Sequence, residues 1–270
     1  MNKNRVSARL AVLAALGLGA FALRATAADK STLQIFAAAS LTGAFTDLGH
    51  TLEQQRPGLR VLFNFAGSQQ LASQIEQGAS AEVFASADER WMNHVRDCAL
   101  LGSTATAFAR NRLVVIVPRT NPARIARLQD LARGGVKLVM GGEAVPVGRY
   151  GRTMFTNLAR DPAFGKDFAT RTLRNVVSEE ENVNAVVSKV QLGEADAGVV
   201  YRSDVTPTVA RFVRVFEIPA SANVIATYPI AVLKSAQRPE LAQAFVDLVL
   251  SEPGQQALEH WGLLRAAGTP

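Results

Sequence analysis

The stretch FAAASL, Phe36 to Leu41, ends a short apolar run and opens an amphipathic one. The run Leu33–Ala38 predicts a buried strand, and the spacing of apolar residues after Ser40 predicts a helix over Leu41–Gln54. A strand-to-helix turn of this kind leaves the first helical N–H groups unpaired and directs them, with the Ser40 hydroxyl, toward one point. Such a point favours an anion.

A second turn of the same kind follows the next predicted strand, Arg60–Phe65. In the sequence FAGSQQL, Gly67 and Ser68 stand at the start of a predicted helix, and Gly67 lets the backbone approach a ligand closely. Each serine alone is also explained as an ordinary helix N-cap. Because two such turns follow neighbouring strands, binding of an oxyanion is as good an explanation of them as two unrelated helix caps.

A third turn lies in GGEAVPVGRYG, Gly141–Gly151, where a predicted strand ends in two glycines and Pro146 precedes a helix. Val147 would present its backbone N–H group at that helix start, because its side chain has no polar chemistry to offer. Arg149 and Arg152 follow one turn later. They could attract an anion, but solvated positions on the helix surface are the simpler interpretation.

A fourth turn precedes the helix that Asn182 and Val183 open, and the acidic run Glu179–Glu181 before it suits the positive end of a helix dipole. A buried strand, Ala197–Tyr201, then places a tyrosine at its carboxyl end, where open α/β sheets bind ligands. The Tyr201 hydroxyl would be a neutral donor there, although packing against the core also explains a single tyrosine.

Short apolar runs alternate with amphipathic segments along most of the chain, which predicts α/β layers with largely parallel sheets. The segment Leu100–Arg112 is rich in small residues and is one candidate boundary, and Ser221–Pro229 is a second. If the chain crosses between two lobes at both places, residues 28–110 and 228–270 form the first lobe and residues 111–227 form the second.

The N-terminus reads as a secretory signal. Basic residues precede the apolar run Leu10–Leu23, and Ala25-Thr26-Ala27 forms an A-x-A site, so cleavage after Ala27 is expected. An uncleaved membrane helix is disfavoured because the run is short for a bilayer. Loss of four basic residues with the signal lowers the net charge from +6 to +2, and no basic patch with interleaved aromatics indicates nucleic acid as a partner.

Residues with catalytic or metal-binding potential are few. The one cysteine, Cys98, excludes an internal disulfide and fits the buried face of a helix over Glu89–Ala99, which Asp88 is expected to cap. The three histidines lack metal-ligand spacing, and no P-loop, dinucleotide fingerprint or G-x-S-x-G elbow occurs. The sequence therefore predicts a binding protein and no enzyme.

Taken in order, FAAASLTGAF, AEVFASADERWM, VPVGRYG, ENVNAVVSKVQLGEADAGVVYRSDV and YPIAVLKSA resemble the periplasmic molybdate-binding proteins, the substrate-binding subunits of molybdate ABC importers. The resemblance covers roughly Leu33 to Leu263. It implies the type II periplasmic-binding-protein fold, with two α/β lobes and a hinged ligand cleft. It also implies a periplasmic monomer that delivers its ligand to the membrane permease and ATPase subunits of an importer.

The resemblance further implies the ligand set. Ser40 and Ser68 would give hydroxyl and amide donors from the first lobe, Val147 and Val183 backbone N–H groups from the second, and Tyr201 its hydroxyl. The ligand would be molybdate or tungstate, held without a cofactor and without direct protein ligands to molybdenum. Val147 stands where alanine is common in the family, which matters little if only the amide binds.

Other functions remain open at this point. The same fold could hold sulfate or a ferric complex, but ferric sites require paired tyrosines or carboxylates, and the chain has only Tyr150, Tyr201 and Tyr228. A hydrolase using Ser40 or Ser68 would need a base that the local sequence does not supply. A regulatory sensor domain is disfavoured by the export signal.

Overall fold

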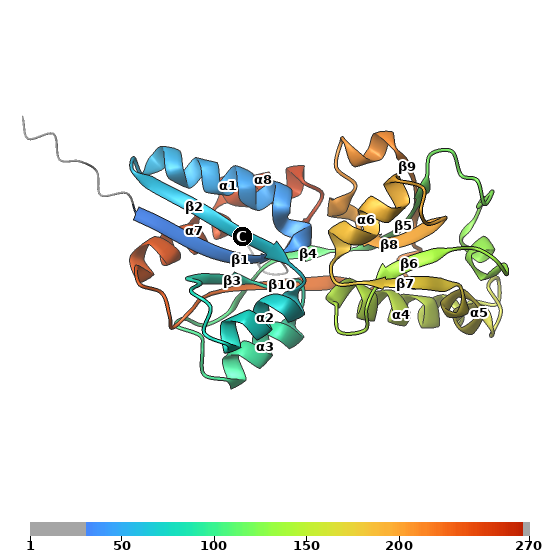
Figure 1. Cartoon of the computed structure of the whole chain (residues 1–270), viewed down its shortest axis with the longest axis horizontal. Helices are drawn as coiled ribbons and strands as arrows, with labels where there is room; N and C mark the ends of the chain where they lie inside the picture. Colours follow the sequence, from blue (N-terminus) through green and yellow to red (C-terminus); the bar gives the residue numbers. More distant parts are fainter. Residues whose placement is uncertain (1–30, 267–270) are drawn as a thin grey trace, which may run out of the picture.

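The computed structural model describes residues 31–266 and arranges them around two β-sheets, each with helices on both faces (Figure 1). The predicted signal peptide, residues 1–27, lies outside the described residues. The first sheet has the order β11-β4-β10-β3-β1-β2. Its strands are β1 (Ser31–Ala38), β2 (Leu59–Ala66), β3 (Val83–Ala85), β4 (Thr106–Asn111), β10 (Ala226–Val232) and β11 (Leu264–Arg265).

Successive side chains of β1 point to opposite faces of this sheet and enter two different apolar clusters. Ile35 and Ala37 belong to one apolar cluster, whereas Phe36 belongs to the other. One face packs against α1 (Thr42–Gln55), α7 (Pro239–Leu250) and α8 (Glu252–His260). The opposite face packs against α2 (Ser68–Glu76) and α3 (Glu89–Asp97) (Figure 1). The sheet is thus covered on both sides, and the C-terminal helices return to the N-terminal half.

The second sheet has the order β7-β6-β8-β5-β9. Its strands are β5 (Leu113–Pro118), β6 (Leu138–Gly141), β7 (Val176–Glu180), β8 (Ala197–Tyr201) and β9 (Val213–Glu217). Its helices are α4 (Pro146–Leu158), α5 (Phe168–Arg174) and α6 (Val183–Gln191). Strand β8 runs antiparallel to β5, with Tyr201 opposite Leu113 at the start of β5, so its carboxyl end lies on the side that faces the first sheet (Figure 1).

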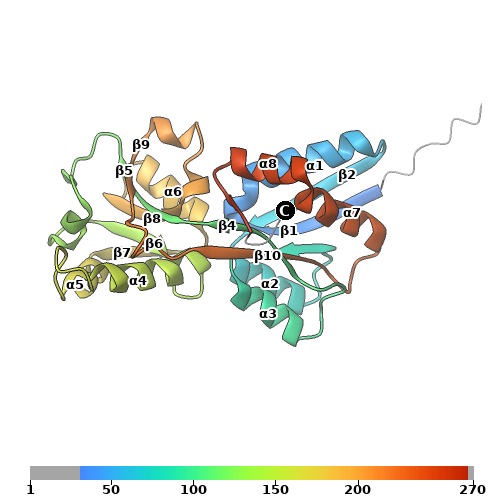
Figure 2. The same ribbon diagram turned by 180° about the vertical axis from the view of Figure 1, so that it is seen from behind.

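Two strands carry the chain between the sheets. Only Arg112 separates β4 of the first sheet from β5 of the second, and the chain returns from β9 into β10. Strands β4 and β10 are antiparallel partners, with Ala226 opposite Asn111, and both run along the connection between the halves (Figure 2). Hinges are usually a few residues at the ends of such elements, so these two crossings are where the halves can move relative to each other.

The expectation of largely parallel sheets is wrong. Strand β1 is parallel to β2 and β3, but β10 runs antiparallel to β3 and β4, and β5 runs antiparallel to β8 and β9. The reason is topological. A strand that returns from the second sheet enters the first one from the opposite end, so its direction is reversed.

Several elements differ from the sequence prediction. Strand β4 occupies the segment expected to be a boundary loop, and strand β7 takes in the first acidic residues of the run before Asn182. Strand β7 is an edge strand, where charged side chains are tolerated, so its sequence carries little strand signal. Helix α4 begins at Pro146 itself, whereas the sequence analysis placed this proline before the helix.

The prediction of a buried Cys98 is also wrong. Helix α3 ends at Asp97, and Cys98 is its exposed C-cap, because the next residue, Ala99, takes a positive φ of 58°. The buried face of the helix consists of Met92 and Val95. Within residues 31–266, no helix combines the length and apolar character needed to cross a membrane.

Candidate functional site

A small cavity lies between the two halves of the molecule, and all five residues predicted for the site line it: Ser40, Ser68, Val147, Val183 and Tyr201. The centre of a water-sized sphere can move within about 20 Å³ of it, so the space suits a small ligand only. The rest of its lining is small or apolar apart from Asn182, and none of the described residues in the lining carries a charge. The structure therefore brings the predicted residues together.

Three helices direct their N-termini at this cavity. Ser68 is the first residue of α2, Val183 is the first of α6, and Val147 follows Pro146 at the start of α4. Proline suits the first helical position, because the N–H group that it lacks would have no partner within the helix there. The N–H groups of the first turn have no partner within their own helix and carry partial positive charge, so three positive helix ends converge on one small space.

Neither serine is a helix N-cap, contrary to the simplest interpretation of the sequence. Gly67 is the N-cap of α2, and Ser40 lies inside the 3-10 turn Ala39–Leu41. The Ser68 hydroxyl accepts the backbone N–H of Ala87 at 3.0 Å, which leaves its own proton available to donate. The capping roles therefore do not account for these hydroxyls.

Ser40 is placed by a residue far along the chain. Its Oγ lies 2.9 Å from the hydroxyl of Tyr228 on β10, and Asn111 Nδ2 donates to the same tyrosine hydroxyl at 3.3 Å. Burial raises the pKa of the Tyr228 hydroxyl, so that group is a neutral donor or acceptor. The Ser40 hydroxyl thus sits on a buried polar network where the two connecting strands meet.

The Tyr201 side chain is 2% exposed, and its hydroxyl has no hydrogen-bond partner among the described residues. Burial raises the pKa of this hydroxyl well above its usual value, so it keeps its proton. Asp204 fixes the backbone of the same residue, because its Oδ2 accepts the Tyr201 N–H at 2.8 Å. A buried, unpartnered donor is costly, and its position in the cavity lining indicates a missing acceptor.

The nearby cations are paired elsewhere. Arg149 donates to Asp88 at 2.9 Å, and Asp88 is fully buried and also caps α3 as predicted. Arg152 forms an ion pair with Glu179 and donates to the carbonyl of Gly148. Both arginines are therefore tied into the protein instead of lying on a solvated helix face, and neither lines the cavity.

Hydrogen bonds join the two halves across the cavity, and they involve residues that the sequence did not single out. Trp91 Nε1 donates to the Ala144 carbonyl at 2.9 Å, and Asn184 Nδ2 donates to the Ala39 carbonyl at 3.3 Å. Gln69 Nε2 and Gln70 Nε2 donate to the backbone and the carboxylate of Glu181 at 2.7 and 2.8 Å. Gln69 and Asn184 directly follow the predicted site residues Ser68 and Val183, and Gln70 comes next after Gln69; this proximity was the signal that the sequence offered.

Comparison with known proteins agrees with this arrangement. The sequence model of the bacterial extracellular solute-binding proteins matches residues 33–264. The chain belongs to this family.

Relatives of this solute-binding protein cover most of its length. The molybdate-binding protein ModA of Mycobacterium bovis is 40% identical over 234 residues, which are 87% of this chain and 85% of the relative. ModA of Escherichia coli is 30% identical over 242 residues, 87% of this chain and 90% of the relative. The periplasmic molybdate-binding protein of Azotobacter vinelandii has a TM-score of 0.73 at 19% identity, covering 87% and 99% of the two chains. The fold is that of a type II periplasmic binding protein, as the sequence predicted.

Gly67→Ala tests how closely the halves approach. A methyl group at this position would collide with the backbone carbonyl of Glu181 in the facing half, an atom that cannot move aside without opening the cleft. We expect the variant to bind the ligand of this solute-binding protein at least about tenfold more weakly, or about 1.4 kcal/mol, in a calorimetric titration. Gly134→Ala is the matched control, because nothing lies within 4 Å of its added carbon. Equal affinities of the two variants would contradict this account of closure.

The buried carboxyl of Asp204 should make the free energy of unfolding of the ligand-free protein depend on pH. Burial raises the pKa of its carboxyl to about 7, so the folded protein keeps a proton that the unfolded chain releases near pH 4. This contribution to stability is full below about pH 4 and is lost as the pH rises through about 7.

Asp204→Asn should therefore match the wild-type free energy of unfolding near pH 4 and exceed it, by on the order of a few kcal/mol, near pH 8. Denaturant unfolding of the wild type and of Asp204→Asn between about pH 4 and pH 8 measures the two free energies. Asp97→Asn, at a side chain that is 68% exposed, should follow the wild-type curve. An Asp204→Asn curve parallel to wild type would show that the Asp204 carboxylate carries no cost of burial.

Proposed function

We propose that this solute-binding protein captures molybdate in the cavity between its lobes and delivers it to the permease and ATPase of an ABC importer. The observation that carries the proposal is the cavity itself. Three helix N-termini and the unpartnered Tyr201 hydroxyl meet there, and none of the described residues lining it is charged. The names of the relatives, molybdate-binding proteins at 40% and 30% identity, support the choice of ligand.

Neutral donors suit a dianion that must later be released. A buried dianion needs hydrogen bonds in place of its lost hydration, and bonds from N–H and O–H groups to a charged oxygen are among the strong ones. Ser40, Ser68, Val147, Val183 and Tyr201 are the proposed donors. They would contact the oxygens of the oxyanion, so molybdenum needs no direct protein ligand and the protein needs no cofactor.

Size would separate the possible ligands. Sulfate, molybdate and tungstate are tetrahedral dianions, so the proposed donors cannot distinguish them by charge or by shape. Tungstate is nearly as large as molybdate, so it should bind as well. Sulfate is smaller and would leave some of the donors out of hydrogen-bonding range, since a cavity closed by contacts between the lobes cannot shrink freely.

Capture would proceed by closure of the two lobes, residues 28–110 with 228–270 and residues 111–227. The proposed donors come from both, so the ligand stabilises the closed form more than the open one. Strands β4 and β10 supply the bending connection. The bonds of Gln69, Gln70, Trp91 and Asn184 across the cleft favour the same closed form.

We also propose that the protein works as a periplasmic monomer after cleavage near Ala27, and that it is not an enzyme. The hydroxyls of Ser40 and Ser68 are hydrogen-bonded to a tyrosine and to a backbone amide in the described structure. Neither of these bonds supplies the histidine or carboxylate base that a serine nucleophile requires. The family that matches the chain is one of solute-binding proteins.

Tyr201→Phe removes one proposed donor without altering the packing of the ring. We expect molybdate affinity to fall by about 1.5–3 kcal/mol, the range for a hydrogen bond to a charged group. The stability of the ligand-free protein should not fall, because the hydroxyl has no partner there to lose. Tyr150→Phe, at a tyrosine outside the cavity lining, is the control. Unchanged molybdate affinity in Tyr201→Phe would remove this residue from the site.

Thermal unfolding with a panel of oxyanions tests the function as a whole. A ligand that binds only the native state adds RT ln(1 + [L]/Kd), about 4 kcal/mol at a thousandfold excess over Kd. Molybdate and tungstate should each raise the melting temperature strongly, and sulfate and phosphate at equal concentration should not. A shift with sulfate alone would reassign the ligand, and no shift with any of the four would refute the oxyanion site.

A further inference from the structure

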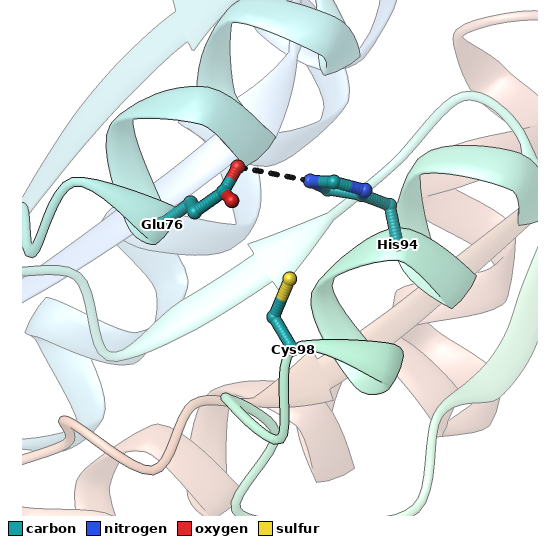
Figure 3. Close-up of side chains that lie close together, drawn as sticks. All are labelled: Glu76, His94 and Cys98. Carbon is teal, nitrogen blue, oxygen red and sulfur yellow. Dashed lines mark hydrogen bonds and ion pairs between the residues drawn. The ribbon is translucent and has the colours of Figure 1, made fainter.

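A second group of potential ligands lies on the first lobe, away from the cavity. Glu76, His94 and Cys98 turn their polar ends toward one another from the ends of α2 and α3 (Figure 3). A carboxylate oxygen, an imidazole nitrogen and the thiol sulfur all lie within 4.8 Å of each other. We propose that these three residues form a binding site for a divalent transition-metal ion of the zinc type.

The chemistry of the three groups selects this class of ion. Thiolate, imidazole and carboxylate are the side chains that bind Zn²⁺, at about 2.0–2.3 Å from the metal. Magnesium and calcium prefer sites built from oxygen atoms alone, so a sulfur and a nitrogen ligand argue against them. Three protein ligands leave a fourth tetrahedral position, which water can fill because the site is at the surface.

The local structure brings the three groups together from two helices. His94 and Cys98 are four residues apart and lie on one side of α3, where the Cys98 N–H donates to the His94 carbonyl at 3.0 Å. Glu76 is the last residue of α2, and its Oε2 lies 3.0 Å from His94 Nε2. Trp91 packs edge-on against the His94 ring at 5.6 Å and limits its rotation.

The ends of the helices provide an independent argument for a cation. Helices α2 and α3 both finish at this cluster, at Glu76 and Asp97. The last carbonyl groups of a helix carry partial negative charge, so two helix ends favour a positive ion here. Exposure of Glu76 and Cys98 leaves their side chains free to close the remaining distance to a metal by rotation alone.

The site is distinct from the oxyanion cavity. Helix α2 has Ser68 at one end and Glu76 at the other, so the proposed anion and cation sites lie at opposite ends of the same helix. A bound metal would join the ends of α2 and α3 without touching any residue that lines the cavity. Metal binding and oxyanion binding can therefore be tested separately, and failure of either leaves the other standing.

The test is a calorimetric titration of the purified, reduced protein with Zn²⁺, together with absorption spectra in Co²⁺. We expect one Zn²⁺ per chain, and a sulfur-to-cobalt charge-transfer band that only a thiolate ligand produces. Cys98→Ser should abolish the band, and both Cys98→Ser and His94→Ala should weaken Zn²⁺ binding at least tenfold. Zinc should raise the melting temperature of the wild type more than that of either variant.

His50 supplies the matched control. It pairs with Glu53 on α1 at 3.4 Å in the same manner but lies outside the cluster, so His50→Ala should bind Zn²⁺ like wild type. All variants should keep the wild-type far-ultraviolet circular dichroism spectrum, which verifies that they are folded without relying on the oxyanion site. The proposal is overturned if the wild type binds no Zn²⁺, or if Cys98→Ser binds it as tightly as wild type.

Discussion

A doubly charged anion that leaves water must recover its lost hydrogen bonds from the protein, and the rest of this structure is arranged around that requirement. The N-termini of α2, α4 and α6 meet at one cavity, where first-turn N–H groups have no acceptor in their own helices. The positive partial charge of these ends favours the anion without a counter-ion. Arg149 forms an ion pair with Asp88, and Arg152 forms one with Glu179. These ion pairs hold the two guanidinium groups away from the cavity.

The same requirement explains why the molecule has two halves. Helix α2 packs on the first sheet, whereas α4 and α6 pack on the second, so the proposed donors can surround a ligand only when the halves meet. Gly67 allows that meeting, because a larger residue would strike the Glu181 carbonyl. The network of Ser40, Tyr228 and Asn111 lies where β4 and β10 pair, and so it links one proposed donor to the bending connection.

Much of this arrangement could be predicted from short stretches of sequence. A strand followed by a small polar residue and an amphipathic helix can be read within a dozen residues, which is why the turns at Ser40, Ser68 and Val183 and the strand ending at Tyr201 were placed correctly. Contacts between distant segments leave no such trace. The bond between Ser40 and Tyr228 joins residues 188 apart, and nothing near Asp88 predicts Arg149 as its partner. Cys98 was misplaced because the helix was extended by two residues, and that error concealed its cluster with Glu76 and His94.

The central claim is that neutral donors from both halves hold the oxyanion, and a crystal of the protein grown with molybdate tests it most directly. Anomalous diffraction at the molybdenum edge locates the metal without reference to any assumed ligand set. The account predicts one strong peak inside the cavity, with the oxyanion's oxygens in hydrogen-bonding range of Ser40, Ser68, Val147, Val183 and Tyr201. A peak elsewhere, or beside the guanidinium of Arg149 or Arg152, would contradict it.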